Sequence, residues 1–393
     1  MQEVLMEDRY YMEHALRLAS AGAGHVTPNP LVGAVLVRNG QVIGEGWHAR
    51  YGGPHAEQAA IDHALQQGND PRGATLYCTL EPCSFTAPDK HNPPCTTAIR
   101  THGIRTVVLA IVDPNPRVRG SGIAQLKQAG IEVRTGVCAR KAVRQNEAYI
   151  LSREQRRPYI VLKWAQSLDG CMATGSHDSK WISSPSAREE AHHLRGRLDA
   201  VMVGSGTAAH DDPQLTVRTA NNRYPQPLRV VVSRHGNLRK DSHLVTQADT
   251  IPTRLYCTGI SPDQQSRLTA AGIQVIPVEP DSESLPSLHQ VMQHLYDDGI
   301  QSILVEGGAR LHASLLRQGL YDRITAFTEP VFLGDGLRPT DNLHPATVAA
   351  APRLLDSEFH RFGSTISISG LHPDAARLLH DLIPDKEASC SPV

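Results

Sequence analysis

The sequence lacks the features that would place the protein in a membrane, outside the cell or on duplex nucleic acid. No apolar run approaches the roughly 20 residues that a membrane-spanning helix needs. The first eight residues are acidic and lack the basic and apolar regions of a signal peptide. Lys and Arg number 39 against 40 Asp and Glu, with no long run of one sign. We therefore expect a soluble, cytoplasmic protein whose partners include neither a membrane nor a nucleic acid.

Cysteine is scarce and scattered. Seven cysteines lie at positions 78, 83, 95, 138, 171, 257 and 390. An odd number in a chain without a secretion signal is a poor disulfide framework. Reduced thiols or metal ligands are the expected states of these side chains.

Length and periodicity indicate two α/β domains. A chain of 393 residues is too long for one compact core. In the first part, residues 31–37 and 41–47 are expected to be strands joined by an Asn-Gly hairpin. Strand patterns at 75–79 and 106–112 then alternate with helical patterns at 56–66 and 96–102, and a charged helical stretch follows at 140–157. This alternation is typical of an α/β layer fold.

The second part repeats the α/β pattern from a new strand at 159–163. Short β-rich runs follow at 199–203, 228–232, 253–256, 274–278 and 302–305. A late pair at 323–327 and 365–369 suggests that the sheet ends with antiparallel strands. We expect one domain over residues 1–150, a second over 157–375, and a polar, disordered tail over 380–393.

The most informative pattern is one histidine followed by two cysteines. His55 lies at the start of a helical pattern, Cys83 follows a strand pattern, and Cys95 comes later. Three such ligands would leave the fourth tetrahedral position of zinc open to water, as catalytic sites do. Glu57, two residues after His55, matches the proton-shuttling glutamate in the His-x-Glu and Pro-Cys signature of zinc deaminases. The alternatives are a closed structural site with a fourth ligand such as His91, or simple burial of these residues.

A second, less specific motif is the Glu306-Gly307-Gly308 turn. It follows a strand pattern and precedes a helical one. Its small residues and exposed N–H groups could cradle a pyrophosphate. Without further context, a plain tight turn is the commoner explanation.

Taken together, the motifs resemble the bifunctional deaminase/reductases of riboflavin biosynthesis. In the first part the resemblance rests on residues 27–33, 44–48, 54–57, 79–84 and 113–116, and in the second on 163–170, 178–183, 198–207, 211–218 and 304–311. It implies a cytidine-deaminase-like three-layer α/β/α domain followed by a dihydrofolate-reductase-like α/β domain. By analogy it also implies a homo-oligomer.

The resemblance further implies the reactions. The first domain would use zinc to deaminate 2,5-diamino-6-(5-phosphoribosylamino)pyrimidin-4-one, a small phosphorylated pyrimidine. The second would use NADPH to reduce 5-amino-6-(5-phosphoribosylamino)uracil to the ribitylamino product.

The resemblance assigns roles to individual residues. In the deaminase, His55, Cys83 and Cys95 are the zinc ligands, Glu57 is the proton shuttle, and Asn29 and His48 contact the substrate. The substrate-binding residues implied for the reductase are Ser179, Arg195, Leu215, Arg218 and Glu306. The implied dinucleotide-binding residues are Lys163, Ala165, Trp181, Thr207, Asp211, Gly307, Gly308, Ala309, Arg310 and Leu311, in a stretch that continues to Ser314.

The residues that would bind the substrate phosphate and the 2′-phosphate of NADPH can also be argued from their chemistry, and each has an alternative explanation. Arg195 and Arg218 suit the substrate phosphate because guanidinium groups bind phosphate in a bidentate way, although a single arginine is often only a solvated surface residue. At the end of the strand over 228–232, either Ser233 or Arg234 could meet the 2′-phosphate of NADPH. Arg234 is favoured on charge, and a turn arginine pointing into water is the alternative.

One departure from the family pattern concerns the loop between the cysteines. Eleven residues separate Cys83 from Cys95, and Phe85 and Thr86 stand where the commoner pattern has a histidine after the Cys-Ser pair. Extra loop length costs little closure entropy, so ligation by both thiolates is still expected.

Two rival functions are weaker. A nucleic-acid deaminase would need a basic groove and stacking aromatics, whereas the net charge is −1 and aromatics make up 5% of the chain. A retired deaminase domain, kept only for assembly, is not supported because His55, Glu57, Cys83 and Cys95 are all present.

Overall fold

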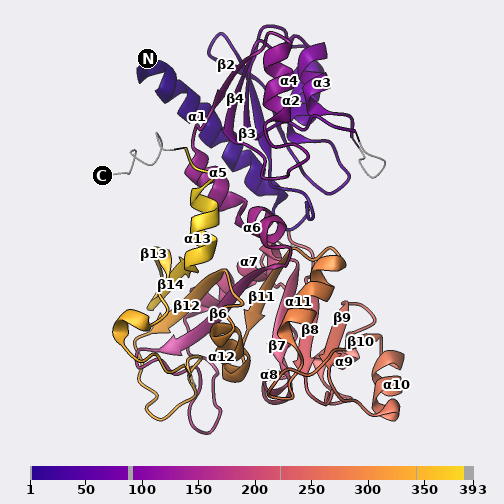
Figure 1. Cartoon of the computed structure of the whole chain (residues 1–393), viewed down its shortest axis with the longest axis vertical. Coiled ribbons are helices and arrows are strands. Elements are labelled where there is room, and N and C mark those ends of the chain that lie inside the picture. The colour runs from indigo at the N-terminus through magenta and orange to yellow at the C-terminus, as the bar shows by residue number, and fades with distance from the viewer. Residues whose placement is uncertain (1, 87–91, 222, 342, 385–393) are drawn as a thin grey trace. The chain divides into compact units, whose positions relative to one another are not determined.

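The chain folds into two compact units, each with its own sheet (Figure 1). The computed structural model describes residues 2–86, 92–221, 223–341 and 343–384. The first unit comprises residues 1–155 together with 377–393, and the second comprises residues 156–376. None of the helices in the described ranges combines the length and the apolar character that crossing a membrane requires.

The first unit is built on a five-stranded sheet of order β2-β1-β3-β4-β5. Its strands are β1 (Gly33–Arg38), β2 (Gln41–Trp47), β3 (Thr75–Leu80), β4 (Thr106–Ile111) and β5 (Glu132–Thr135). β1 pairs antiparallel with β2 and β3, whereas β3, β4 and β5 run parallel. The predicted Asn-Gly hairpin is confirmed, because Asn39 and Gly40 both have the positive φ that a tight two-residue turn requires.

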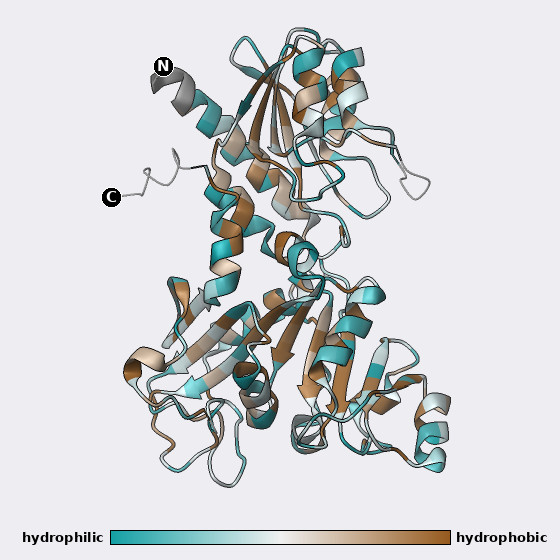
Figure 2. Ribbon diagram, in the orientation of Figure 1, coloured by the Kyte–Doolittle hydropathy of each residue, from teal (hydrophilic) through white to brown (hydrophobic). Residues whose placement is uncertain are grey.

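Helices cover both faces of this sheet. One layer consists of α2 (Ala56–Gln66), α3 (Cys95–Thr101) and α4 (Ser121–Gln128), and the other of α1 (Gln2–Ala19) and α5 (Ala139–Gln145). Alternate strand residues such as Leu36 and Leu109 pack against Ile61 of α2 and Leu126 of α4. Figure 2 shows the central strands of the sheet as hydrophobic segments, as expected for strands that are covered on both faces. The three-layer α/β/α arrangement is therefore as predicted.

Two glycines of β2 set how closely α2 approaches the sheet. A Cβ atom on Gly44 would lie 2.3 Å from the carbonyl oxygen of Ala60, and one on Gly46 would lie 2.3 Å from the Ala60 nitrogen. Both contacts are with backbone, so no side chain can move aside. Glycine at these two positions therefore sets the distance between α2 and the sheet. The first turn of α2 carries functional residues.

The charged helical stretch predicted over 140–157 consists of two helices, α5 and α6 (Glu147–Gln155). The break falls at Asn146, which is buried. Its amide bonds both backbone groups of Leu31: Nδ2 donates to the carbonyl at 3.0 Å, and the N–H of Leu31 donates to Oδ1 at 2.8 Å. This clamp holds the loop that carries Asn29.

The second unit contains a nine-stranded sheet of order β10-β9-β8-β7-β11-β6-β12-β14-β13. Its strands are β6 (Tyr159–Ser167), β7 (Ala200–Gly204), β8 (Leu228–Ser233), β9 (Thr253–Cys257), β10 (Ile273–Pro277), β11 (Ser302–Glu306), β12 (Arg323–Glu329), β13 (Leu355–Phe362) and β14 (Thr365–Leu371). The first seven strands in this order are parallel, and β14 pairs antiparallel with β12 and β13. The predicted strands and the antiparallel ending are confirmed.

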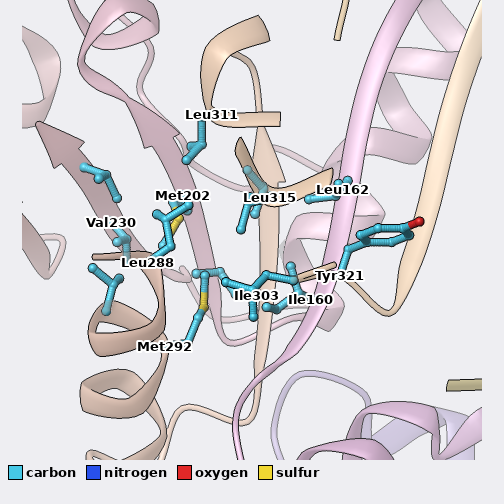
Figure 3. Close-up of a cluster of buried hydrophobic side chains, with 14 of the residues drawn as sticks. Ile160, Leu162, Met202, Val230, Leu288, Met292, Ile303, Leu311, Leu315 and Tyr321 are labelled. Atoms are coloured by element: carbon cyan, nitrogen blue, oxygen red, sulfur yellow. The ribbon is translucent and has the colours of Figure 1, made fainter. Parts of the chain in front are cut away.

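The helices of this unit are α7 (Pro185–Arg197), α8 (Ser205–His210), α9 (His243–Thr246), α10 (Pro262–Ala270), α11 (Leu288–Asp297) and α12 (Ala309–Arg317). In Figure 3, side chains of α11 and α12 meet one face of the sheet; the labelled members of this core are Leu288, Met292, Leu311 and Leu315 from the helices, Ile160, Leu162, Met202, Val230 and Ile303 from the strands, and Tyr321.

The chain closes with α13 (Pro373–His380). The predicted disordered tail was placed over 380–393. His380 is the last residue of α13, and residues 385–393 lie outside the described part of the chain.

Candidate active sites

The three predicted metal ligands come together in the first unit. His55 immediately precedes α2, Cys83 follows β3, and Cys95 is the first residue of α3. The Nδ1 atom of His55 lies 3.5 Å from Sγ of Cys83 and 3.3 Å from Sγ of Cys95, and the two sulfurs are 3.4 Å apart. A tetrahedral zinc ion with bonds of about 2.1 to 2.3 Å separates its ligand atoms by roughly 3.6 to 3.8 Å. One imidazole and two thiols at this spacing fit zinc.

The site offers three ligands, which would leave the fourth coordination position of a tetrahedral metal open to water, as in catalytic sites. Within the described ranges, no fourth His, Cys, Asp or Glu joins the three ligand atoms, which all lie within 4.8 Å of one another. His91, the alternative fourth ligand considered from the sequence, lies outside the described residues.

Glu57 is in the first turn of α2 and is buried beside these ligands, with 3% of its surface exposed. Burial raises the pKa of its carboxyl group, and the neighbouring Cys83 adds to the effect. A carboxyl group that gains a proton readily is suited to shuttle one.

His48 and Asn29 form a hydrogen-bonded pair next to His55. Nδ1 of His48 lies 2.9 Å from the carbonyl oxygen of Pro54, and its Nε2 lies 3.0 Å from Nδ2 of Asn29. A carbonyl oxygen only accepts, so Nδ1 carries the proton and Nε2 accepts from the Asn29 amide. Burial lowers the pKa of His48, which favours this neutral form. The pair therefore fixes the amide of Asn29, leaving its Oδ1 free to accept a hydrogen bond.

Glu81, to which sequence reasoning assigned no role, anchors the loop of Cys83. Its carboxylate accepts four backbone hydrogen bonds from a neighbouring loop and the start of α4; the donors are the N–H groups of Asp113 at 3.3 Å, Gly120 at 2.9 Å, Gly122 at 2.9 Å and Ile123 at 3.1 Å. The only sequence signal was its place inside the Glu-Pro-Cys motif. Its partners lie more than 30 residues away, so no local pattern reveals them.

In the second unit, Lys163, Arg195 and Glu306 form a buried charged cluster. Lys163 on β6 and Glu306 on β11 are register partners in the sheet. Arg195 of α7 donates to Glu306 through Nε at 2.8 Å and Nη2 at 2.5 Å. Burial alone would raise the pKa of Glu306, but Arg195 and Lys163 hold it at about 2. Burial also lowers the pKa of the Lys163 ammonium.

The loop over 214–218 lies against this cluster. Nη1 of Arg195 donates to the Thr216 carbonyl at 3.0 Å. Arg218 donates through Nη1 to Oε1 of Gln214 at 2.8 Å and to Oγ1 of Thr216 at 2.9 Å. Leu215 is buried with a left-handed φ of 54°. The structure thus places the predicted residues Arg195, Leu215 and Arg218 around one loop.

The Gly307-Gly308 turn joins β11 to α12, with both residues at positive φ. Thr207 of α8 lies against it: a Cβ atom on Gly307 would be 3.0 Å from Cγ2 of Thr207. The N–H groups that begin α12 at Ala309, Arg310 and Leu311 have no partner inside the helix. The turn has the form of an anion-binding helix start.

The remaining predicted residues of the reductase make fewer contacts with the charged cluster. Trp181 is 71% exposed, with the Arg188 guanidinium 4.7 Å from its ring centre. The Asp211 carbonyl accepts from Lys180 Nζ at 3.1 Å. Ala165 lies on β6, two residues beyond Lys163. In the part of the chain that the structure describes, neither Ser179 nor Trp181 hydrogen-bonds to the cluster of Lys163, Arg195 and Glu306.

At the end of β8, Ser233 and Arg234 differ in what their side chains do. Oγ of Ser233 is buried and accepts from the N–H of Gly236 at 3.0 Å, so the hydroxyl is engaged in a turn. Arg234 is exposed, and its carbonyl accepts from the N–H of Gly259 at 2.9 Å. Of the two, Arg234 has the freer polar side chain.

Comparison with protein families divides the chain at the same place as the two sheets. A family model described as the cytidine and deoxycytidylate deaminase zinc-binding region matches residues 5–111. A second, described as the RibD C-terminal domain, matches residues 158–368.

Individual relatives match over nearly the whole length. The riboflavin biosynthesis protein RibD of Aquifex aeolicus is 41% identical over 330 residues, which are 84% of this chain and 89% of that protein. RibD of Escherichia coli is 35% identical over 375 residues, covering 92% and 99%. A crystal structure from Thermotoga maritima, of a diaminohydroxyphosphoribosylaminopyrimidine deaminase/5-amino-6-(5-phosphoribosylamino)uracil reductase, is similar with a TM-score of 0.80 and 34% identity over 94% of this chain and 99% of that one. These matches confirm a cytidine-deaminase-like first unit and a reductase second unit.

Proposed function

The chain belongs to the family of the riboflavin biosynthesis protein RibD. From this family and the geometry of the two sites, we propose the substrate of each site and the residues that act on it. As a member of this family it is a bifunctional enzyme of riboflavin biosynthesis, a zinc-dependent deaminase joined to an NADPH-dependent reductase. The deaminase substrate is 2,5-diamino-6-(5-phosphoribosylamino)pyrimidin-4-one. The reductase substrate is the deaminated product, 5-amino-6-(5-phosphoribosylamino)uracil. The Thermotoga maritima relative, which bears the names of both activities, supports these substrates.

The observation that carries the deaminase is the convergence of His55, Cys83 and Cys95 beside a buried Glu57. These three residues would hold zinc, which supplies Lewis-acid activation of water. Glu57 takes the proton that this water must lose and passes it to the departing amine, so that ammonia leaves and a carbonyl replaces the 2-amino group. Asn29, with its amide fixed by His48, accepts a hydrogen bond from the pyrimidine ring and orients it.

In the reductase, NADPH would supply a hydride to the former C1′ of the sugar, while the bond from this carbon to the ring oxygen breaks and that oxygen takes up a proton. The Gly307-Gly308 turn and the start of α12 hold its pyrophosphate, and Thr207 lines the turn. Lys163 and Glu306 lie at the centre where the hydride is transferred. Arg195 uses three of its five N–H donors on Glu306 and Thr216, so two remain to bind the substrate phosphate together with Arg218.

We propose that the enzyme acts in the cytoplasm, as a homo-oligomer, on a small molecule rather than on nucleic acid. None of the six cysteines within the described ranges forms a disulfide, as a reducing compartment favours. An exposed apolar face at one end of the second sheet, formed by Phe359, Ile366 and Ile368, supports self-association.

One experiment separates this function from its rivals. Ammonia release from the phosphorylated diaminopyrimidine and the zinc content are measured on the same sample. The oxidation of NADPH is then measured with the deaminated compound as the substrate. We expect stoichiometric zinc and both activities. A sample that oxidises NADPH but releases no ammonia would indicate a retired deaminase, and deamination of tRNA alone would indicate a nucleic-acid enzyme.

A further inference from the structure

The backbone of the loop over 214–218 is held by side chains that lie outside the loop. Gln226 bonds both backbone groups of Val217, accepting from its N–H at 2.8 Å and donating to its carbonyl at 3.0 Å. Arg195 donates to the carbonyl of Thr216. The N–H of Arg218 points to Nδ1 of His192, 3.3 Å away on α7. A loop fixed in this way is preorganised before any ligand binds.

The geometry of His192 determines which role its Nδ1 plays. This atom lies 3.2 Å from the Thr216 carbonyl and 3.3 Å from the Arg218 nitrogen. A ring nitrogen either donates or accepts, so only one of these bonds forms at a time. The Thr216 carbonyl keeps Arg195 as a donor whichever ring nitrogen carries the proton, whereas in the described chain the N–H of Arg218 has no acceptor other than Nδ1. Nδ1 therefore accepts from Arg218.

The charges around His192 favour the same state. Burial, followed by the positive charges of Arg195 and Arg218, holds the pKa of His192 at about 4. The ring is therefore neutral at neutral pH, with one protonated nitrogen and one lone pair. In the tautomer protonated at Nε2, Nδ1 is the acceptor that the Arg218 N–H needs.

Arg218 is thus fixed at both ends. Its backbone N–H is bonded to His192, and its guanidinium is bonded to Gln214 and Thr216 within the loop. Burial lowers the pKa of Arg218, and the charge of Arg195 lowers it further. Two guanidinium groups held near each other repel, and a phosphate bound by both relieves that repulsion.

We propose that His192 is a positioning residue of the reductase, which fixes the backbone of Arg218 so that Arg218 and Arg195 bind the phosphate of the substrate together. This inference rests on the proposed function of the site. His192 itself need not touch the substrate. Its contribution is specificity for the phosphorylated pyrimidine.

The test compares two replacements of similar size. His192→Asn places an amide oxygen near the position of Nδ1 and keeps an acceptor, whereas His192→Leu fills the space without one. We expect His192→Leu to raise the KM of the phosphorylated pyrimidine about tenfold, the equivalent of about 1.4 kcal/mol. The Ki of inorganic phosphate as a competitive inhibitor should rise by the same factor. kcat and the KM of NADPH should stay within about twofold, and His192→Asn should restore most of the KM.

The control is His193→Ala. His193 is the next residue on α7, and its ring packs edge-on against Tyr224, 5.9 Å away. If His193→Ala raises the KM as much as His192→Leu does, the effect comes from general disturbance of α7 and the proposal is overturned. A fall in kcat in place of the rise in KM, or His192→Asn behaving like His192→Leu, overturns it as well.

Arg218→Ala separates this inference from the proposed function. If Arg218→Ala leaves the KM and the Ki of phosphate unchanged, the phosphate site itself is wrongly assigned. If Arg218→Ala raises both while His192→Leu raises neither, the phosphate site stands and only the role of His192 is wrong.

Discussion

At the scale of single residues, zinc binding and proton transfer in the deaminase should be separable. Glu57 is buried beside the metal ligands but is not one of the three. We expect Glu57→Gln to keep stoichiometric zinc and to lower deamination by roughly 10²- to 10⁴-fold, because the amide cannot shuttle a proton. Metal analysis and ammonia release on one sample check this. The reductase activity of the same chain is the internal control, and loss of zinc from the variant would contradict the assignment.

The two cysteines should behave differently from Glu57. Removing either thiol leaves only two ligands, so Cys83→Ala and Cys95→Ala should each lose zinc and deaminase activity. Cys78→Ala is the matched control, because Cys78 is a buried thiol of β3 outside the ligand group. Zinc content after dialysis is the measurement. Full zinc and activity in Cys95→Ala would mean that another residue of the long loop, such as His91, serves as the ligand.

Arg234 should contribute to the choice between NADPH and NADH. Its side chain is exposed at the end of β8, while the hydroxyl of Ser233 is engaged in the turn. A charge-assisted bond to the 2′-phosphate contributes about 1.5 to 3 kcal/mol. Arg234→Ala should therefore lower the ratio of kcat/KM for NADPH to that for NADH by roughly tenfold or more. The ratio of kcat/KM for the two cofactors is compared with that of Lys240→Ala, which removes another exposed cation later in the same loop region. An unchanged ratio would make Arg234 a solvated turn residue.

The sequence revealed residues whose chemistry is local and missed those that act by long-range backbone contacts. His55 and Glu57 lie two positions apart in a recognisable pattern, and in the structure His55 is close enough to act on the pKa of Glu57. Glu81 and His192 instead bond backbone N–H groups more than 20 residues away. Such bonds depend on how elements pack and have no signature in a single sequence.

At the scale of elements, the strands were predictable because short apolar runs bounded by turns mark them. The division between α5 and α6 was not, since residues on both sides of Asn146 have helical character. The residue at the break makes a tertiary contact, the double hydrogen bond between Asn146 and Leu31. Propensity is a weak guide where a buried side chain competes for the backbone.

This clamp makes the junction between α5 and α6 a support of the deaminase site. Asn146→Ala would leave the N–H and carbonyl of Leu31 without their partner, at a cost of about 1 to 3 kcal/mol, and would loosen the loop of Asn29. We expect a lower melting temperature and a KM for the diaminopyrimidine raised several-fold, with zinc retained. Gln145→Ala, which removes a single bond to the carbonyl of Leu16 in α1, is the control. Equal effects of the two variants on KM would show that the clamp does not position Asn29.

At the scale of the whole molecule, two α/β units were expected from length and from the restart of the strand pattern. Which strands pair could not be read in the same way, because periodicity reports burial and not neighbours. β6 illustrates this: it pairs with β11 and β12, more than 130 residues later. The same pairing brings Lys163 beside Glu306, so the centre of the reductase site is a product of sheet order.

The end of that sheet predicts how copies of the chain associate. β13 is an edge strand, and Phe359 on it pairs across from Ile368 of β14, with Ile366 on the same face. Phe359 is 68% exposed and Ile366 is 49% exposed. Burying one such aromatic side chain contributes about 1.5 to 3 kcal/mol. In a two-fold interface the same side chain of both copies is buried, so this contribution is made twice. Phe359→Asp should therefore weaken self-association by about a hundredfold or more, observed as a lower molar mass in light scattering across a dilution series. His360→Asp places the same charge on the opposite face of β13 and should leave the mass unchanged. A wild-type protein that is monomeric at micromolar concentration, or a Phe359→Asp variant that keeps the full mass, would show that this face is not the interface.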